Sequence, residues 1–173
     1  ASARPEMLWF EVMFSLGSHR ATPRGDRFLP RGASVCPAMT ENDHYFTAEP
    51  ASPNERRRVR VRLAGRPVEV EVAPGIFSPG GLDKGTAVLL VEAPAPPATG
   101  TFLDLGCGWG PIALTLALSS PNATVHALDV NERALDLARR NAAELGLERV
   151  TATTADGIPD DVRFDLIWSN PPI

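Results

Sequence analysis

The chain has 173 residues, a formal net charge of −4 and a hydrophobic content of 43%. This length is enough for one domain with a hydrophobic core, and the acidic balance excludes a global electrostatic attraction to nucleic acid. Cys36 and Cys107 are too few for a disulfide framework or a metal site, and no apolar run approaches the ~20 residues that span a bilayer. A reducing, cytoplasmic setting is therefore expected.

The first 38 residues show no helix or strand period. Residues 17–37 are rich in Arg, Gly, Pro and Ser, and the patterning of a folded domain begins only after Met39. We therefore expect residues 1–38 to be a poorly ordered N-terminal extension, with Met39 as a natural start. Residues 39–97 are expected to form a lead-in of hairpin and helix, and residues 98–173 the main fold.

Two stretches of the lead-in alternate with period two, residues 56–63 and residues 68–72, on either side of the turn at residues 64–67. This pattern predicts a β-hairpin whose valines face inward and whose arginines pair across the strands with Glu69 and Glu71. Two interpretations of the arginines remain open, a phosphate-contacting patch for RNA or an ordinary solvated hairpin face. The arginines concerned are Arg56, Arg57, Arg58, Arg60 and Arg62.

A turn-rich loop at residues 74–81 precedes a helix predicted over residues 82–92, with Asp83 near its start. Gly85 weakens this helix slightly. A proline-rich connector at residues 94–100 then separates the lead-in from the main fold. The apolar stripe of the helix is expected to comprise Ala87, Leu90 and Val91.

The most informative stretch is T-F-L-D-L-G-C-G-W-G at residues 101–110. Its first five residues are apolar apart from Asp104 and predict a buried parallel strand. Pro111 then opens a helix predicted over Pro111–Ser119. Strand, glycine turn and helix in this order give a cradle of bare backbone at a helix N-terminus, where unpaired N–H groups and a partial positive charge can face a ligand. The loop comprises Gly106, Cys107, Gly108, Trp109 and Gly110.

The glycine spacing G-x-G-x-G differs from the G-x-G-x-x-G of dinucleotide-binding folds. Asp104 precedes the first glycine closely, and its carboxylate would repel a pyrophosphate. The pattern suits a ligand with an ammonium group and a carboxylate, and S-adenosylmethionine has both, together with a sulfonium. An ordinary glycine-rich loop is the alternative at this point.

Three further strands are predicted downstream. Residues 123–129 form one that ends at Asp129, where a carboxylate can accept both hydroxyls of a ribose. The alternative is that this segment caps the following helix, residues 132–145, because Asn131 directly precedes it. Residues 149–154 form an edge strand followed by Asp156-Gly157, which either reaches an adenine amine or is a plain turn. Residues 164–169 form the last strand, which leads into Asn170-Pro171-Pro172-Ile173.

Taken together, residues 104–110, Asp129, Asp156-Gly157 and residues 170–173 resemble the class I S-adenosylmethionine-dependent methyltransferases. Within them, the chain is most similar to the methyltransferase small domain group, which includes bacterial ribosomal RNA guanine-N2 methyltransferases. Residues 74–85 also resemble that group. The resemblance implies a doubly wound, Rossmann-like α/β fold whose core, residues 98–173, binds S-adenosylmethionine. The implied cofactor contacts are Asp104, Gly106, Cys107, Gly108, Gly110, Asp129, Val130, Asn131, Asp156, Gly157 and Asn170, with no metal.

The resemblance assigns catalysis to Asn170, Pro171 and Pro172. The Asn170 side-chain oxygen and the Pro171 carbonyl would accept the N–H groups of an exocyclic amine and turn its lone pair toward the methyl group, while the prolines stiffen the loop. Positioning should supply most of the rate, since no general base is obvious. Ile173 stands where many relatives have an aromatic residue that stacks on the target. The implied substrate contacts are Phe77, Ser78 and Ile173.

The expected substrate is guanine N2 of ribosomal RNA, with the base splayed out of its helix. A protein glutamine or DNA adenine-N6 methyltransferase shares the same logic, and a non-catalytic cofactor-binding remnant is a third alternative. The family sheet has further strands after this motif. We therefore expect the chain to be a fragment of a longer enzyme, with an open edge at its last strand and weak or no activity alone.

Overall fold

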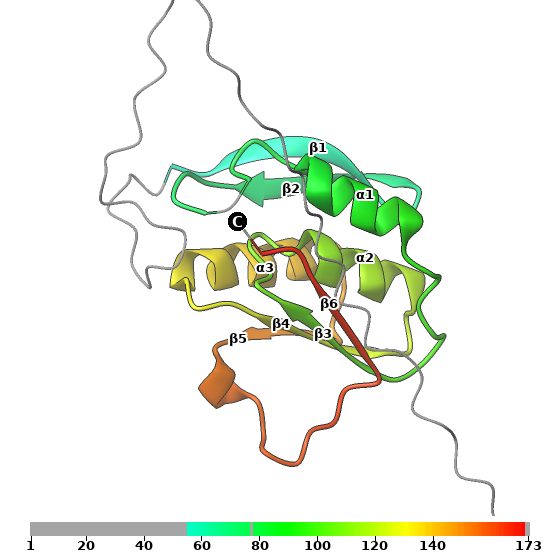
Figure 1. Ribbon diagram of the computed structural model, residues 1–173. Helices are drawn as coiled ribbons and strands as arrows, with labels where there is room; N and C mark the ends of the chain where they lie inside the picture. Colours follow the sequence, from blue (N-terminus) through cyan, green and yellow to red (C-terminus); the bar gives the residue numbers. More distant parts are fainter. Residues whose placement is uncertain (1–54, 77, 172–173) are drawn as a thin grey trace, which may run out of the picture.

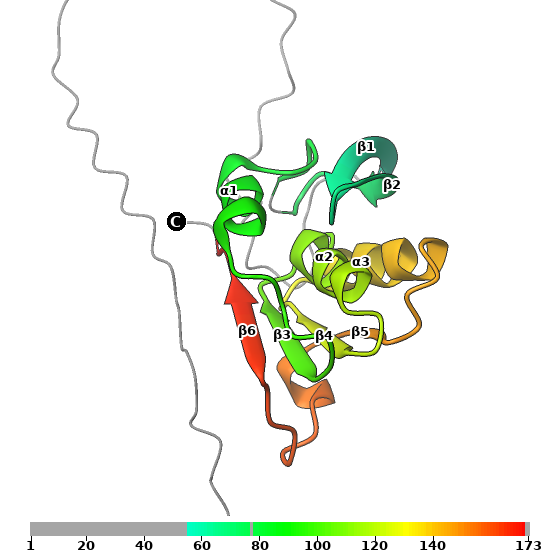
Figure 2. The ribbon, with the colours of Figure 1, turned by 90° about the vertical axis from the view of Figure 1, so that its right-hand side faces the viewer.

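The computed structural model describes residues 55–76 and 78–171. This part of the chain forms three layers, in which a hairpin, a layer of helices and a sheet lie one above the other (Figures 1 and 2). The predicted extension at residues 1–38 and the proposed start at Met39 lie outside the described residues. None of the described helices is long and apolar enough to cross a membrane.

The hairpin forms as predicted, since β1 (Arg57–Leu63) pairs antiparallel with β2 (Arg66–Val72). Ala64 and Gly65 make its two-residue turn with positive φ angles of 47° and 73°, a turn conformation that matches the twist of the flanking strands. The valines face inward, as Val70, which is fully buried, illustrates. The hairpin therefore presents one apolar face to the rest of the molecule.

The sheet has four parallel strands in the order β5-β4-β3-β6. The polar strand β5 lies at one edge, as predicted, and β6 forms the other edge of the described sheet. β6 begins later than predicted because the Asp165 carboxylate accepts a hydrogen bond from the Thr101 N–H (2.8 Å) at the base of the sheet. The strands are β3 (Thr101–Leu105), β4 (Thr124–Leu128), β5 (Val150–Thr153) and β6 (Leu166–Ser169).

Helices α2 (Pro111–Ser119) and α3 (Glu132–Glu144) lie between the sheet and the hairpin (Figure 2). Both begin at the predicted residues, and Gly146 follows the end of α3 with φ of 67°, as a C′ glycine does. The connection from β5 to β6 passes on the other side of the sheet through a short 3₁₀ turn, Ala155–Gly157 (Figure 1). Crossovers on both sides of a parallel sheet make this the predicted doubly wound α/β fold.

Helix α1 (Lys84–Glu92) departs from the prediction in its buried face. Val91 was expected in the apolar stripe but is 78% exposed, whereas Thr86 is only 3% exposed. The helix packs against α2 and the core through Leu89 and Leu90, and this contact turns Thr86 inward and Val91 outward. Of the predicted stripe, Leu90 packs against the core as expected and Ala87 is partly buried, so only Val91 was misplaced.

Two apolar clusters lie on opposite sides of the helix layer. The lower cluster joins α2 and α3 to the sheet and includes Phe102, Leu116 and Val125. The upper cluster joins the same helices to the hairpin and includes Val70 and Leu114. The helices therefore pack against both the hairpin and the sheet.

Candidate active site

The parallel strands end at one edge of the sheet, and the predicted site residues follow them there. Leu105 of β3 pairs in register with Leu128 of β4 on one side and with Ser169 of β6 on the other. The Ser169 hydroxyl also donates a hydrogen bond to the Leu105 carbonyl (2.7 Å). The glycine loop and the asparagine-proline segment therefore lie side by side. The residues that come next in these strands are Gly106, Asp129 and Asn170.

The glycine loop presents bare backbone above the sheet edge. The N–H groups of Gly106 and Cys107 both donate to the Leu128 carbonyl (2.8 and 2.9 Å), which ties the loop to β4. Gly106 has φ of 79°, and a Cβ placed there would meet nothing within 4 Å. Gly110, with φ of 97°, is different, because its Cβ would crowd Ala138 of α3 at 3.4 Å. Gly106 therefore borders open space, while Gly110 allows α2 and α3 to pack closely.

Asp129 holds the glycine loop from the neighbouring strand. Its two carboxylate oxygens accept the N–H groups of Gly108 and Asn131, each at 2.9 Å. A carboxylate has about four acceptor positions, so Asp129 keeps capacity for further donors. Its predicted contact with ribose hydroxyls stays a prediction, and so does the cofactor contact of its half-exposed neighbour Val130.

Asn131 is only 1% exposed and has a structural role. Its side-chain oxygen accepts the Arg133 N–H (3.0 Å) and caps α3, while its amide nitrogen donates to the Gly75 carbonyl (2.9 Å). The capping alternative therefore applies to Asn131. Its predicted contact with the cofactor stays a prediction.

Asp104 is fully buried beneath the glycine loop. One carboxylate oxygen, Oδ2, accepts the Ala113 N–H of α2 at 2.9 Å, while Oδ1 has no hydrogen-bond partner among the described residues. Burial raises the pKa of Asp104 to about 7, the Ala113 N–H lowers it and the charge of Asp129 raises it. Burial also raises the pKa of the Cys107 thiol well above its usual value, so Cys107 is a neutral filler. An unpaired buried carboxylate oxygen suits a cationic ligand such as an ammonium group.

A pocket opens where α1, the glycine loop and Asn170 meet. The residues around it that were predicted from the sequence are Ser78, Gly106, Cys107, Gly108 and Asn170. Those that the sequence did not single out as site residues are Gly81, Asp83, Thr86, Trp109, Pro111 and Ile112. The open space above Gly106 fits the glycine-loop end of S-adenosylmethionine. Asp104 lies fully buried beneath the loop and does not border this pocket. Asp129 and Gly110 do not border the pocket either, and the cofactor contacts of Asp104, Asp129 and Gly110 stay predictions.

Asn170 is held at the start of helix α1, a contact that could not be predicted from the sequence. Its side-chain nitrogen donates to the Thr86 hydroxyl (2.9 Å) and lies 3.4 Å from both carboxylate oxygens of Asp83. The Thr86 hydroxyl donates in turn to the Asp83 carboxylate. The only local signal was an aspartate at a helix start with a threonine in the first turn, which is typical of capping.

Asp156 and Gly157 are exposed in the 3₁₀ turn and do not border this pocket. A Cβ at Gly157 would lie 1.8 Å from the Thr153 hydroxyl, so the glycine is required by the turn itself. This favours the plain-turn alternative, and the adenine contact of Asp156 stays a prediction. Pro171 is described and exposed, whereas three predicted residues lie outside the described part of the chain: Phe77, Pro172 and Ile173.

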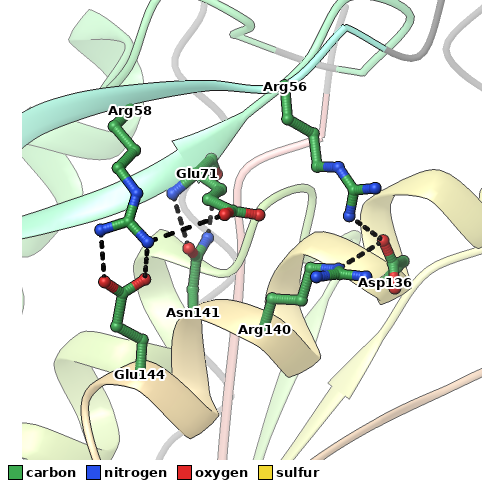
Figure 3. A network of polar contacts seen from close by, with 7 residues as sticks. All are labelled: Arg56, Arg58, Glu71, Asp136, Arg140, Asn141 and Glu144. Carbon is green, nitrogen blue, oxygen red and sulfur yellow. Dashed lines mark hydrogen bonds and ion pairs between the residues drawn. The ribbon is translucent and has the colours of Figure 1, made fainter.

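The arginines of the hairpin are engaged within the chain. Arg56 pairs with Asp136 (3.3 Å) and Arg58 with Glu144 (2.6 Å), both on α3 (Figure 3). The predicted cross-strand pairs are confirmed, with Arg58 to Glu71 at 3.9 Å and Arg60 to Glu69 at 3.0 Å. Two guanidinium groups donate to backbone carbonyls, those of Arg57 to Pro79 and Arg62 to Gly65. These contacts favour the interpretation as an ordinary hairpin face.

Comparison with known proteins places this geometry in a family. The family model of the methyltransferase small domain matches residues 67–173. The uncharacterized protein YbxB of Bacillus subtilis is 33% identical over 135 residues, which are 76% of this chain and 67% of YbxB. Ribosomal RNA small subunit methyltransferase C of Pseudomonas entomophila is 38% identical over 132 residues, but these cover only 39% of that protein.

A solved structure agrees with these matches. The 16S rRNA N2 G1207 methyltransferase of T. thermophilus, in complex with AdoMet and guanosine, superposes with a TM-score of 0.60 at 26% identity. The superposition covers 72% of this chain and 35% of that one, so the chain spans about a third of this neighbour. The chain belongs to the methyltransferase small domain family of class I S-adenosylmethionine-dependent methyltransferases.

Proposed function

We propose that this protein methylates an exocyclic amine of RNA, guanine N2 of small-subunit ribosomal RNA. The observation that carries the proposal is the position of Asn170, which borders the same pocket as the open backbone of Gly106. An amide acceptor beside a cofactor cradle is what transfer to a weakly nucleophilic amine requires. The printed names of two relatives, a ribosomal RNA small subunit methyltransferase and a 16S rRNA N2 methyltransferase, support RNA as the substrate class.

An exocyclic amine of a base is a poor nucleophile because its lone pair is delocalised into the ring. The Asn170 side-chain oxygen and the Pro171 carbonyl would accept its two N–H groups and hold the nitrogen with its lone pair out of the ring plane. Asp104, Gly106 and Asp129 would hold S-adenosylmethionine, which supplies an electrophilic methyl group on its sulfonium. Orientation of the two reactants then provides the rate enhancement.

The test is transfer of tritiated methyl groups from S-adenosylmethionine to 16S ribosomal RNA transcribed in vitro, which carries no modification. Protein extract and unmethylated DNA serve as parallel substrates, and nuclease digestion identifies the labelled nucleoside. We expect N2-methylguanosine. Label in glutamine or in N6-methyladenine would instead support the two alternative enzymes, and cofactor binding without label in any substrate would support a non-catalytic remnant.

The variant Asn170→Ala separates chemistry from cofactor binding. We expect methyl transfer to fall at least about 100-fold, because a hydrogen-bond acceptor for the target amine is lost. The affinity for S-adenosylhomocysteine, measured by calorimetry, should stay within about twofold, because the glycine loop is unchanged. Transfer at the wild-type rate by Asn170→Ala would contradict the proposed role of this residue.

A further inference from the structure

The amide of Asn170 has two ends in different environments. Its nitrogen donates to the Thr86 hydroxyl at 2.9 Å and approaches the Asp83 carboxylate at 3.4 Å. Its oxygen accepts no hydrogen bond from the part of the chain that the structure describes. Asn170, Thr86 and Asp83 all border the pocket, so the unpaired oxygen belongs to a residue at the pocket wall.

The chemistry of the three groups allows one direction for the hydrogen-bond chain. The Asp83 carboxylate can only accept, so the Thr86 hydroxyl hydrogen points to it. The same hydroxyl then has only lone pairs left for Asn170, so the amide must present its N–H group and not its oxygen. Rotation of the amide by 180° would place its oxygen against a carboxylate, which is repulsive. Thr86 and Asp83 therefore fix which end of Asn170 remains unpaired.

We propose that Thr86 and Asp83 are positioning residues for methyl transfer, which hold the Asn170 amide with its oxygen available to the amine of the substrate. This inference rests on the proposed function, since it adds the groups that orient the proposed acceptor. These residues come from α1, and Asn170 lies 84 residues beyond Thr86 in the chain. The lead-in helix is thereby part of the active site.

Capping of α1 does not by itself require a hydroxyl group at position 86. Asp83 caps the helix through the backbone N–H groups of Gly85 (2.8 Å) and Thr86 (3.3 Å), which any residue at position 86 except proline provides. The hydroxyl links Asp83 to Asn170, and at 3% exposure Thr86 is one of the few buried polar side chains of the lead-in. A valine, which has the same shape, would serve the packing equally well.

Gly85 leaves room for this arrangement. A Cβ at Gly85 would lie 3.0 Å from the Asn170 side-chain oxygen and 3.1 Å from its nitrogen. Alanine is a better helix former than glycine, so the glycine is unfavourable for α1 itself. The amide of Asn170 and the Asp83 carboxylate, which would lie 3.2 Å from this Cβ, together occupy the space that a side chain at position 85 would take.

The test compares Thr86→Val, which removes the hydroxyl, with Thr86→Ser, which keeps it, on unmodified 16S ribosomal RNA. Thr115→Val is the matched control, because Thr115 is a helical threonine of 7% exposure whose hydroxyl bonds only the Pro111 carbonyl among the described residues. For Thr86→Val we expect kcat to fall at least about tenfold while KM for RNA and cofactor affinity stay within about threefold. Thr86→Ser and Thr115→Val should retain most of kcat. An unchanged kcat in Thr86→Val would overturn the proposal.

A second measurement does not depend on the substrate. The side-chain amide resonances of Asn170 in the ligand-free protein should show protection from hydrogen exchange that is lost in Thr86→Val and kept in Thr86→Ser and Thr115→Val. Gly85→Ala should shift the same resonances and lower kcat. If no RNA is methylated but this protection follows the hydroxyl, the proposed function fails and the orientation of Asn170 stands. If the Asn170 amide is protected equally in Thr86→Val and in the wild type, the inference fails whatever the substrate is.

Discussion

At the scale of single residues, Asp104 presents a conflict between stability and binding. Its carboxyl group is fully buried, and burial raises its pKa from 3.8 to about 7, so the folded protein takes up a proton here that the unfolded chain releases above pH 4. The associated stability is fully present below pH 3.8 and is lost as the pH rises through 7. Above pH 7 the folded protein therefore carries a destabilising buried charge, which a bound ammonium group would compensate.

The variant Asp104→Asn removes this charge and leaves the shape of the side chain. We expect it to be more stable than the wild type at pH 8, and its advantage to be about 2 kcal/mol smaller at pH 5, where the wild-type carboxyl is protonated in the fold. S-adenosylmethionine affinity at pH 8 should fall at least about tenfold. Urea unfolding at the two pH values and calorimetry measure these effects, with Asp161→Asn at an exposed site as control. Equal stability differences at both pH values would show that Asp104 is not the group that titrates.

At the scale of elements, the contact between the hairpin and α3 combines exposed ion pairs with one buried amide (Figure 3). Asn141 of α3 is fully buried and bonds to both backbone groups of Glu71 on β2, at 2.7 and 3.0 Å. Its nitrogen also donates to the Trp109 carbonyl of the glycine loop at 3.0 Å. Arg58 contacts Glu144 nearby, but its side chain is 56% exposed. The amide, and not the ion pair, should hold the hairpin in place.

Two substitutions measure this difference. Asn141→Ala leaves one buried and two partly buried backbone groups without this partner, and we expect the free energy of unfolding to fall by about 3 kcal/mol. Arg58→Ala should cost less than about 1 kcal/mol, because exposed ion pairs contribute little. Urea denaturation compares the two variants. Asn141→Ala should also weaken cofactor binding, since Trp109 belongs to the glycine loop. An equal fall in the free energy of unfolding in both variants would contradict this, because the exposed ion pair would then contribute as much as the buried amide.

The elements were predictable where their signals are local. The hairpin turn, the proline at the start of α2 and the asparagine before α3 each specify their own backbone, and all three were located correctly from the sequence. The buried face of α1 was predicted only in part, with Leu90 correct and Val91 wrong, because this face depends on where α2 lies. The partners of Arg58 and Asn170 lie 86 and 84 residues away in the chain, and no local pattern encodes such pairs. The glycine loop and Asn170 were found because each follows a strand, and parallel strands share one carboxyl edge.

At the scale of the whole molecule, α2 and α3 join the three layers, because they pack against the hairpin on one side and against the sheet on the other. The upper cluster beneath the hairpin and the lower cluster above the sheet use opposite sides of these helices, and partly buried Leu90, Leu147 and Val150 pack against both clusters. Neither helix can move without disturbing both clusters. We therefore expect the hairpin and the sheet to unfold as one cooperative unit, although the sequence suggested a lead-in divided from the main fold by a proline-rich connector.

Leu114→Ala tests this connection, because Leu114 is fully buried on α2 in the upper cluster, away from the sheet. The cavity should cost about 2 to 5 kcal/mol. If the layers are coupled, hydrogen exchange should accelerate equally for the backbone amides of β2 and of β3 and β4, even though only β2 lies near the cavity. Val88→Ala, at a position of 54% exposure on α1, should leave both sets nearly unchanged. Faster exchange confined to the hairpin would mean that the hairpin opens independently of the sheet.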